Sequence, residues 1–108
     1  MQISVTSRHG PITDAIRQYA EKKVAKLVRY YDRVQAIEVV FDRESVQYTA
    51  ELIVSTERQR FVASEFGEDP YAALDLVVDK MERQLTRHKE RFRNRKHLAR
   101  KPPAGGAP

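Results

Sequence analysis

The chain has 108 residues, contains no cysteine and carries a formal net charge of +5 at pH 7. A chain of this length holds one domain with a modest core, and without cysteine it has neither disulfides nor thiolate metal sites. No stretch approaches the roughly 18 apolar residues of a membrane span, and the N-terminus lacks the apolar run of a signal peptide. We therefore expect a cytoplasmic protein with no membrane partner.

The charges are segregated along the chain. Residues 1–33 carry a net charge of +4, residues 34–79 a net charge of −7 and residues 80–108 a net charge of +8. Such a chain has one surface that attracts polyanions and another that repels them. Segregation this strong favours polyanion binding over a merely solubilising surface.

The N-terminal part of the sequence predicts a strand followed by a helix. Residues 2–6 alternate apolar and polar side chains, which is typical of a strand. Gly10-Pro11 then breaks the chain, and Thr13 is a good helix N-cap. Apolar residues recur at helical spacing from there to about Tyr31, which predicts one amphipathic helix.

The rest of the chain predicts three strands and a second helix. Residues 36–43, 47–55 and 60–65 each alternate apolar and polar side chains, and the short links between them suit hairpins. Asp69 and Pro70 are good N-cap and first-turn residues, and an apolar stripe follows them as far as Phe92.

These elements indicate an α+β fold in the order β-α-β-β-β-α. We expect a four-stranded sheet with both helices on one face, because each amphipathic helix must bury its apolar stripe. Residues 1–95 are predicted to form this domain. Residues 96–108 are basic and rich in proline and glycine, and we expect them to be a disordered tail.

Basic side chains recur at helical spacing on both predicted helices. At 100° per residue each stripe covers about 60° of arc. The stripes consist of Lys22, Lys26, Arg29 and Arg33 on the first helix and Lys80, Arg83, Arg87 and Arg91 on the second. Lys23 points into the apolar arc, so its ammonium group must extend outward past the core. One stripe alone is no better evidence for a ligand than for a solvated face, but two neighbouring stripes favour phosphate binding, and hence RNA.

The sequence offers little for catalysis or metal binding. His9, His88 and His97 lie far apart without ligand spacing, and no glycine-rich phosphate loop is present. Ser7 and His9 do not suggest a triad, because the sequence places no carboxylate to orient the histidine. Acidic side chains at Glu38, Asp42 and Glu51 are expected to form a solvated sheet face. We therefore expect no enzyme, no metal, no cofactor and no small-molecule substrate.

Several segments resemble a known family. They are ITDAIRQY at 12–19, KKVAKLVRYYDRV at 22–34, AEL at 50–52, VASE at 62–65, DPYAALD at 69–75 and DKMERQLTRHKER at 79–91. In order and spacing they resemble the short form of the bacterial ribosome hibernation-promoting factors and the ribosome-associated inhibitor protein Y. The last two segments are the most specific, and the resemblance covers nearly all of residues 1–92.

The resemblance implies a fold like that of a double-stranded-RNA-binding domain with an added N-terminal strand. It also implies binding to the small ribosomal subunit and its 16S rRNA, in the channel for mRNA and tRNA. Translation would be inhibited because the A and P sites are occluded. The positions that match the family's basic residues are Lys23, Lys26, Arg29, Arg33, Lys80, Arg83, Arg87 and Lys89. Lys22 and Arg91 are added from helical spacing alone.

Other interpretations of the sequence stay open. A second ribosome-modulating factor is a further expected partner if the chain promotes ribosome dimerisation. The sequence of the tail does not indicate whether the chain promotes or opposes dimerisation. A general binder of structured RNA is one alternative function, since double-stranded-RNA modules recognise shape. A modulator of an alternative sigma factor is another.

Overall fold

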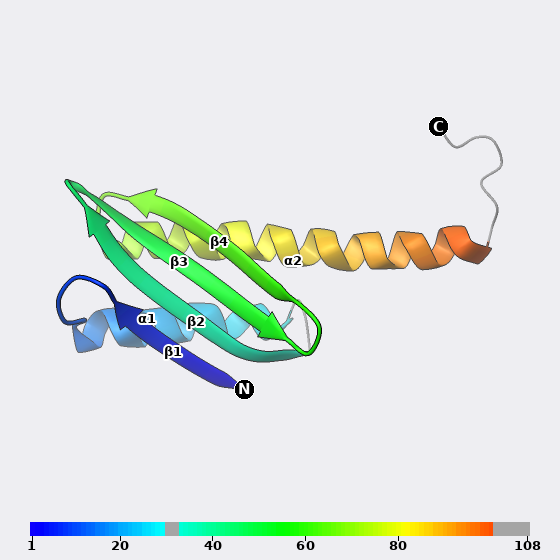
Figure 1. The fold of residues 1–108 in the computed structure, drawn as a ribbon, viewed down its shortest axis with the longest axis horizontal. Coiled ribbons are helices and arrows are strands. Elements are labelled where there is room, and N and C mark those ends of the chain that lie inside the picture. Colours follow the sequence, from blue (N-terminus) through cyan, green and yellow to red (C-terminus); the bar gives the residue numbers. More distant parts are fainter. Residues whose placement is uncertain (30–32, 101–108) are drawn as a thin grey trace.

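The structure is a computed structural model that describes the backbone of residues 1–29 and 33–100, with side chains described for residues 1–29 and 33–89. The elements are β1 (Gln2–Ser7), α1 (Asp14–Ala25), a 3-10 helix η1 (Lys26–Arg29), β2 (Val34–Glu44), β3 (Gln47–Thr56), β4 (Arg60–Gly67) and α2 (Pro70–Arg100) (Figure 1). The predicted order β-α-β-β-β-α is confirmed.

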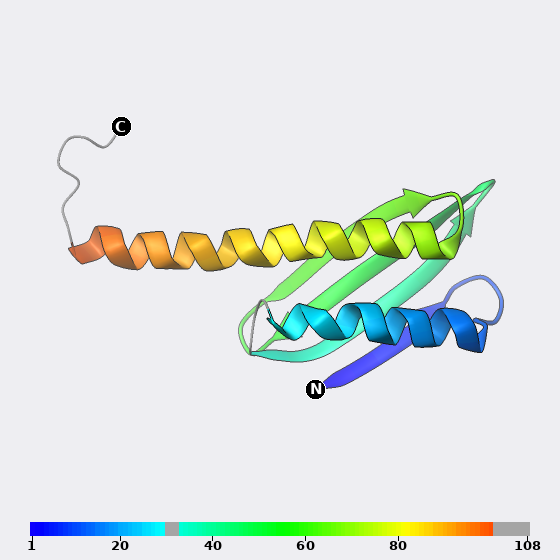
Figure 2. The same ribbon diagram turned by 180° about the vertical axis from the view of Figure 1, so that it is seen from behind.

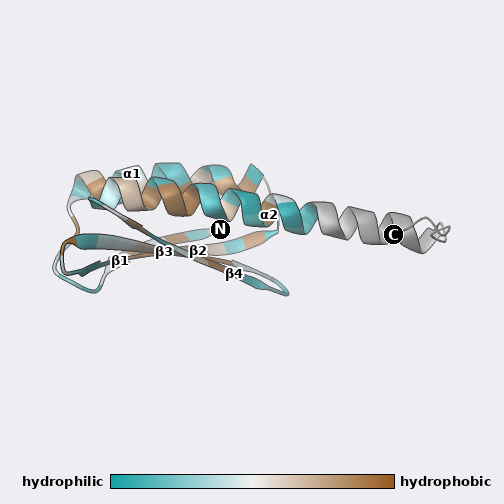
Figure 3. Ribbon diagram, turned by 90° about the horizontal axis from the view of Figure 1, so that it is seen from above, coloured by the Kyte–Doolittle hydropathy of each residue, from teal (hydrophilic) through white to brown (hydrophobic). Residues whose placement is uncertain are grey.

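The four strands form one mixed sheet in the order β1-β2-β3-β4. β1 pairs with β2 in parallel, with Ile3 opposite Ile37, whereas β2, β3 and β4 are joined by antiparallel hairpins. Both helices lie on the same face of this sheet and leave the other face open, as the views from behind and from above show (Figures 2 and 3). The predicted two-layer arrangement is therefore confirmed.

The core lies between the sheet and the two helices. Alternate residues of each strand point to the helix layer because successive side chains of a strand face opposite sides. The completely buried large side chains come from β2, β3 and all three helical segments, and they are Val24, Leu27, Ile37, Val39, Leu52, Val54, Leu74, Val77, Val78, Met81 and Leu85. Tyr71, at the start of the apolar stripe predicted for the second helix, is 38% exposed rather than buried, and its ring packs edge-on against Tyr19.

Local hydrogen bonds fix where both helices begin. The Thr13 hydroxyl accepts the N–H of Ile16 at 3.2 Å, and the Asp69 carboxylate accepts the N–H of Ala72 at 2.8 Å. Both predicted N-caps are therefore confirmed. Gly67, at the end of β4, lies so close to α2 that a Cβ atom would stand 2.4 Å from the backbone nitrogen of Ala73. Glycine at this position lets the sheet meet the helix.

The first helix ends earlier than predicted. The α-helix stops at Ala25 and tightens into η1, and Arg33 stands in a turn directly before β2. A 3-10 helix turns about 120° per residue rather than 100°, so the single stripe predicted through Arg33 is wrong beyond Ala25. Tyr31, the predicted end of this helix, lies outside the described residues.

The second helix is longer than predicted and continues to Arg100. The expected boundary between domain and tail at residue 95 thus falls inside α2. No glycine or proline interrupts the sequence between Pro70 and Pro102, so nothing in the chain terminates the helix earlier. Residues 101–108 lie outside the described residues. In the part that is described, neither helix is long and apolar enough to cross a membrane.

Candidate nucleic-acid interface

Most of the predicted site residues lie on the three helical segments of the helix layer. α1 and α2 lie side by side and run in the same direction (Figure 2). The rings of Tyr19 and Tyr71 hold them together with centroids 5.0 Å apart, and the Tyr19 hydroxyl donates to the carboxylate of Asp75 at 2.7 Å. The two helices therefore present one continuous surface to solvent.

Exposed cations lie on all three helical segments. Lys22 lies on α1, Arg29 on η1, and Arg83 and Arg87 on α2, and all four side chains are exposed. None of the four forms an ion pair with another described residue. We call them the flank cations. Cations without protein partners are available to phosphates, and arginine can hold a phosphate with two parallel hydrogen bonds.

Two predicted site residues are already paired with acids of α2. Lys23 Nζ lies 3.2 Å from the Asp75 carboxylate and 5.8 Å from the centre of the Tyr19 ring. Lys26 Nζ lies 3.8 Å from the Glu82 carboxylate. The hydrogen bond that Lys23 donates to Asp75 raises the pKa of Lys23 above its usual range, and the bond that Tyr19 donates to the same carboxylate raises the pKa of Tyr19. These two ion pairs line the contact between the helices, and we call them the seam.

Lys80 points away from the seam toward the free edge of the sheet. Its ammonium donates to the backbone oxygen of Ser64 at 3.3 Å and lies 3.4 Å from the carboxylate of Glu65. Gln84 donates to the backbone oxygen of Val62, also on β4, at 3.4 Å. Edge strands expose unpaired backbone groups, and these two side chains cover part of that edge. Lys80 therefore has a structural role that helical spacing did not reveal.

The remaining predicted cations lie at the turn before β2 and toward the end of α2. Arg33 and Lys89 are exposed, at the turn before β2 and on α2 respectively. The side chain of Arg91 lies outside the described residues. His88 is partly buried and packs edge-on against Phe61 with centroids 5.2 Å apart.

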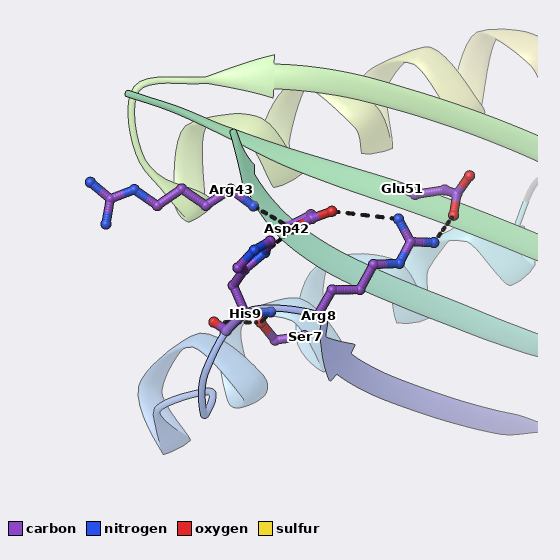
Figure 4. Close-up of polar contacts among 6 residues, drawn as sticks. All are labelled: Ser7, Arg8, His9, Asp42, Arg43 and Glu51. Atoms are coloured by element: carbon purple, nitrogen blue, oxygen red, sulfur yellow. Dashed lines mark hydrogen bonds and ion pairs between the residues drawn. The ribbon is translucent and has the colours of Figure 1, made fainter. Parts of the chain in front are cut away.

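The opposite, open face of the sheet carries a polar network (Figure 4). The guanidinium of Arg8 bridges the carboxylates of Asp42, at 3.6 Å, and Glu51, at 3.5 Å. The imidazole of His9 contacts the same Asp42. The pKa of Asp42 is lowered, first by the backbone N–H of Arg43 and then by His9. Arg8 and His9 thus lie against acids on this face.

The structure supplies the carboxylate for His9 that the sequence did not place. The parallel register sets Ser7 opposite Phe41, which brings His9 beside Asp42. The register between two strands that are distant in the sequence cannot be inferred from residue spacing. The contact between His9 and Asp42 could therefore not be predicted. Ser7 Oγ bonds to the backbone of His9 at 3.2 Å rather than to its ring. These three residues therefore do not form a nucleophile and its base.

The open face also differs from the expected acidic surface in its apolar content. Val40 and Ile53 share it with the acids, and Val62 and Phe66 of β4 are 47% and 51% exposed. Among the described residues, no group of three His, Asp or Glu side chains could hold a metal ion. A pocket of about 260 Å³ lies beside the polar network, with Ile12, Phe41 and Tyr48 in its lining.

Comparison with known proteins identifies the family. Residues 3–93 match the family model described as Sigma 54 modulation protein / S30EA ribosomal protein. The ribosome hibernation promoting factor of Escherichia coli K12 is 38% identical over 93 residues, which cover 86% of this chain and 98% of that protein. The factor of the same name from Azotobacter vinelandii is 36% identical over 91 residues, covering 84% of this chain and 85% of that protein.

Two solved structures have the same fold. A ribosomal subunit interface protein from Coxiella burnetii superposes with a TM-score of 0.78 at 26% identity, over 83% of this chain and 99% of that one. The N-terminal domain of Protein Y from Thermus thermophilus gives a TM-score of 0.72 at 38% identity, over 82% of this chain and 99% of that domain. The chain belongs to the Sigma 54 modulation protein / S30EA ribosomal protein family.

Proposed function

We propose that this protein is a ribosome hibernation factor that binds 16S rRNA in the mRNA and tRNA channel of the small subunit. The observation that carries the proposal is the set of flank cations on the helices, which are exposed and form no ion pair among the described residues. Sequence-independent RNA binding depends on phosphate contacts of this kind. The names of the relatives, which describe ribosome hibernation and ribosomal subunit interfaces, agree with it.

Inhibition requires no chemical step. A domain with principal extents of 56 × 29 × 18 Å that lies in the channel excludes mRNA and tRNA from the A and P sites by its volume. The helix layer faces the RNA in this arrangement, and the open sheet face, with Glu38 exposed on it, points away from the phosphates. Binding and inhibition are then one event, so a change that abolishes the first abolishes the second.

Two measurements test this function. Purified protein added to an in-vitro translation reaction is expected to lower protein synthesis, and in a sucrose gradient it is expected to move with the small subunit. The same gradient reports ribosome dimers, with and without a second ribosome-modulating factor. A protein that inhibits nothing and stays at the top of the gradient contradicts the proposal.

Two alternatives predict different outcomes. A general binder of structured RNA is displaced from ribosomes by a modest excess of free duplex RNA, whereas a factor fitted to the channel is not. The family description also names sigma 54 modulation. A sigma-factor partner held by apolar contacts is expected to stay bound at high salt, where phosphate contacts weaken steeply.

A further inference from the structure

The two outer strands of the sheet, β1 and β4, each have one free edge (Figure 1). The register between β3 and β4 shows which residues of β4 turn their backbone groups to that edge. Thr56 N donates to Gln59 O across the turn at 2.8 Å, and hydrogen-bonded and non-hydrogen-bonded pairs alternate along an antiparallel ladder. The even-numbered residues from Arg60 to Phe66 therefore direct their N–H and C=O groups away from β3.

Side chains of α2 occupy two of these outward carbonyl groups. Lys80 Nζ donates to Ser64 O at 3.3 Å, and Gln84 Nε2 donates to Val62 O at 3.4 Å. The spacings match, because four helical residues rise about 6 Å and two strand residues rise about 6.8 Å. One turn of the helix can therefore reach two successive outward carbonyl groups.

The free edge of β1 is covered in the same way. Arg8 N donates to Phe41 O of β2, so alternate residues of this parallel strand, Val5 among them, turn their backbone groups away from β2. The guanidinium of Arg17 on α1 donates to Val5 O at 3.2 Å. In each of these three hydrogen bonds a helix side chain donates to an outward carbonyl group at a free edge.

We propose that Lys80 and Gln84 close the edge of β4 to a strand from a second copy of the chain. The unpaired backbone groups of an edge strand are a template for pairing with another chain, and native proteins protect such edges. A carbonyl group that already accepts a hydrogen bond from α2 is less available to a partner strand. The inference does not depend on the proposed function.

A second copy of β4 is the strand that this edge would otherwise fit. An antiparallel pairing centred on Ser64 sets each Val62 opposite the other copy's Phe66. The same register sets each Arg60 opposite the other copy's Glu68. Val62 and Phe66 are 47% and 51% exposed, and both charged residues are exposed as well. Apolar pairs and opposite-charge pairs across strands are stabilising, so β4 is complementary to itself.

The environment of Gln84 supports a protective role. Its Oε1 atom is buried and has no hydrogen-bond partner in the part of the chain that the structure describes. A buried acceptor without a partner destabilises the fold, and an apolar side chain at this position would avoid that penalty. Protection of the edge accounts for the amide, since natural proteins give up stability to exclude unwanted pairing.

The variant Lys80→Ala/Gln84→Ala tests whether the two side chains close the edge. The probe is a fluorescent peptide with the sequence of residues 59–68, and its binding to the full chain is followed by fluorescence anisotropy. We expect the variant to bind the peptide at least about tenfold more tightly than the wild type does, if each freed carbonyl group gains one hydrogen bond of ordinary strength. Equal binding by the wild type and the folded variant overturns the inference.

Two controls separate strand pairing from other causes. A peptide with an N-methyl group on the nitrogen of Ser64 lacks the central backbone donor, so the gain in affinity is expected to disappear. Gln18→Ala/Lys22→Ala removes the same two residue types at the same spacing from exposed positions of α1, and it is expected to bind the peptide as the wild type does. A gain that survives N-methylation, or an equal gain in the control variant, overturns the inference.

The single variant Lys80→Ala keeps the test decisive should the double variant not fold. The Lys80 side chain is 47% exposed, so its replacement leaves the core intact. It frees Ser64 O, the central acceptor of the pairing, and is expected to give about half of the gain in logarithmic units. No gain from this variant overturns the inference.

Discussion

The two faces of the sheet are covered in different ways and carry their charges differently. On the open face, the described cations Arg8 and His9 lie against the carboxylates of Asp42 and Glu51. On the helix layer, the flank cations pair with no other described residue. The difference teaches that the number of charges on a surface is a poor guide to binding. Among the described residues, four exposed cations of the helix layer form no ion pair, whereas Arg8 and His9 on the open face each contact a carboxylate.

The largest effect is expected when the flank cations are removed. The variant Lys22→Ala/Arg29→Ala/Arg83→Ala/Arg87→Ala is expected to lose inhibition of in-vitro translation at protein concentrations where the wild type is fully active. Fold stability should change little, since exposed substitutions usually stay within about 0.5 kcal/mol each. Circular dichroism checks the fold. Full inhibition by a folded variant would assign binding to another surface.

A smaller effect, on fold stability, is expected at the contact between the sheet and α2. Gly67→Ala places a methyl group 2.4 Å from the backbone nitrogen of Ala73, and backbone cannot move aside as a flexible side chain can. We expect unfolding free energy to fall by about 1–3 kcal/mol, as for other overpacked sites. Urea denaturation measures it. Ser64→Ala on the same strand is the control, because Lys80 bonds only to the backbone oxygen of Ser64. Equal stability of the two variants would mean that the backbone around Gly67 and Ala73 can move apart to accept the methyl group.

The open face is expected to show a pH effect on stability rather than on binding. The pKa of Asp42 is lowered in the folded chain from its ordinary value of 3.8, by the backbone N–H of Arg43 and by His9. A lowered pKa stabilises the fold above the ordinary value, and this stability is lost as the pH falls through the folded pKa. The wild type is therefore expected to have a higher melting temperature than Asp42→Asn at neutral pH. Below pH 3.8 the two melting temperatures are expected to converge. A difference in melting temperature that stays constant across this range would contradict the assignment.

The smallest effect is expected from neutralising the acids of the open face. Glu38→Gln/Glu51→Gln should leave binding to small subunits unchanged or slightly tighter, because this face points away from the RNA in the proposed arrangement. Sedimentation with small subunits measures it. A large loss of binding at unchanged stability would mean that the molecule binds in the opposite orientation.

Sequence periodicity predicted the fold because each strand and helix must turn its apolar side chains toward the core. Alternation along β2 to β4 and the apolar stripes of both helices are direct consequences of burial, so residues such as Leu52 and Leu74 could be assigned to the core before the structure was known. Both N-caps followed from residue type for the same local reason. The end of α1 could not be predicted, because Lys26 to Arg29 differ from an α-helix only in how tightly they are wound.

The site was predicted less completely than the fold. Helical spacing identified exposed positions such as Arg83 and Arg87, but it could not show that Lys23, Lys26 and Lys80 have partners on other elements. Those partners depend on how α1 lies against α2 and how α2 lies along β4. Nor could helical spacing show that Asp75 of α2 pairs with Lys23 of α1. Tertiary contacts decide which charges remain free.

The salt dependence of binding to small subunits tests the central claim most directly. Each phosphate contact contributes about one to the slope of log affinity against log salt. The variant without the flank cations is therefore expected to lose about one unit of slope per residue removed, while Glu38→Gln/Glu51→Gln keeps the wild-type slope. A folded flank variant that sediments with small subunits and retains the full wild-type slope would contradict the assignment of the helix layer as the RNA-binding surface.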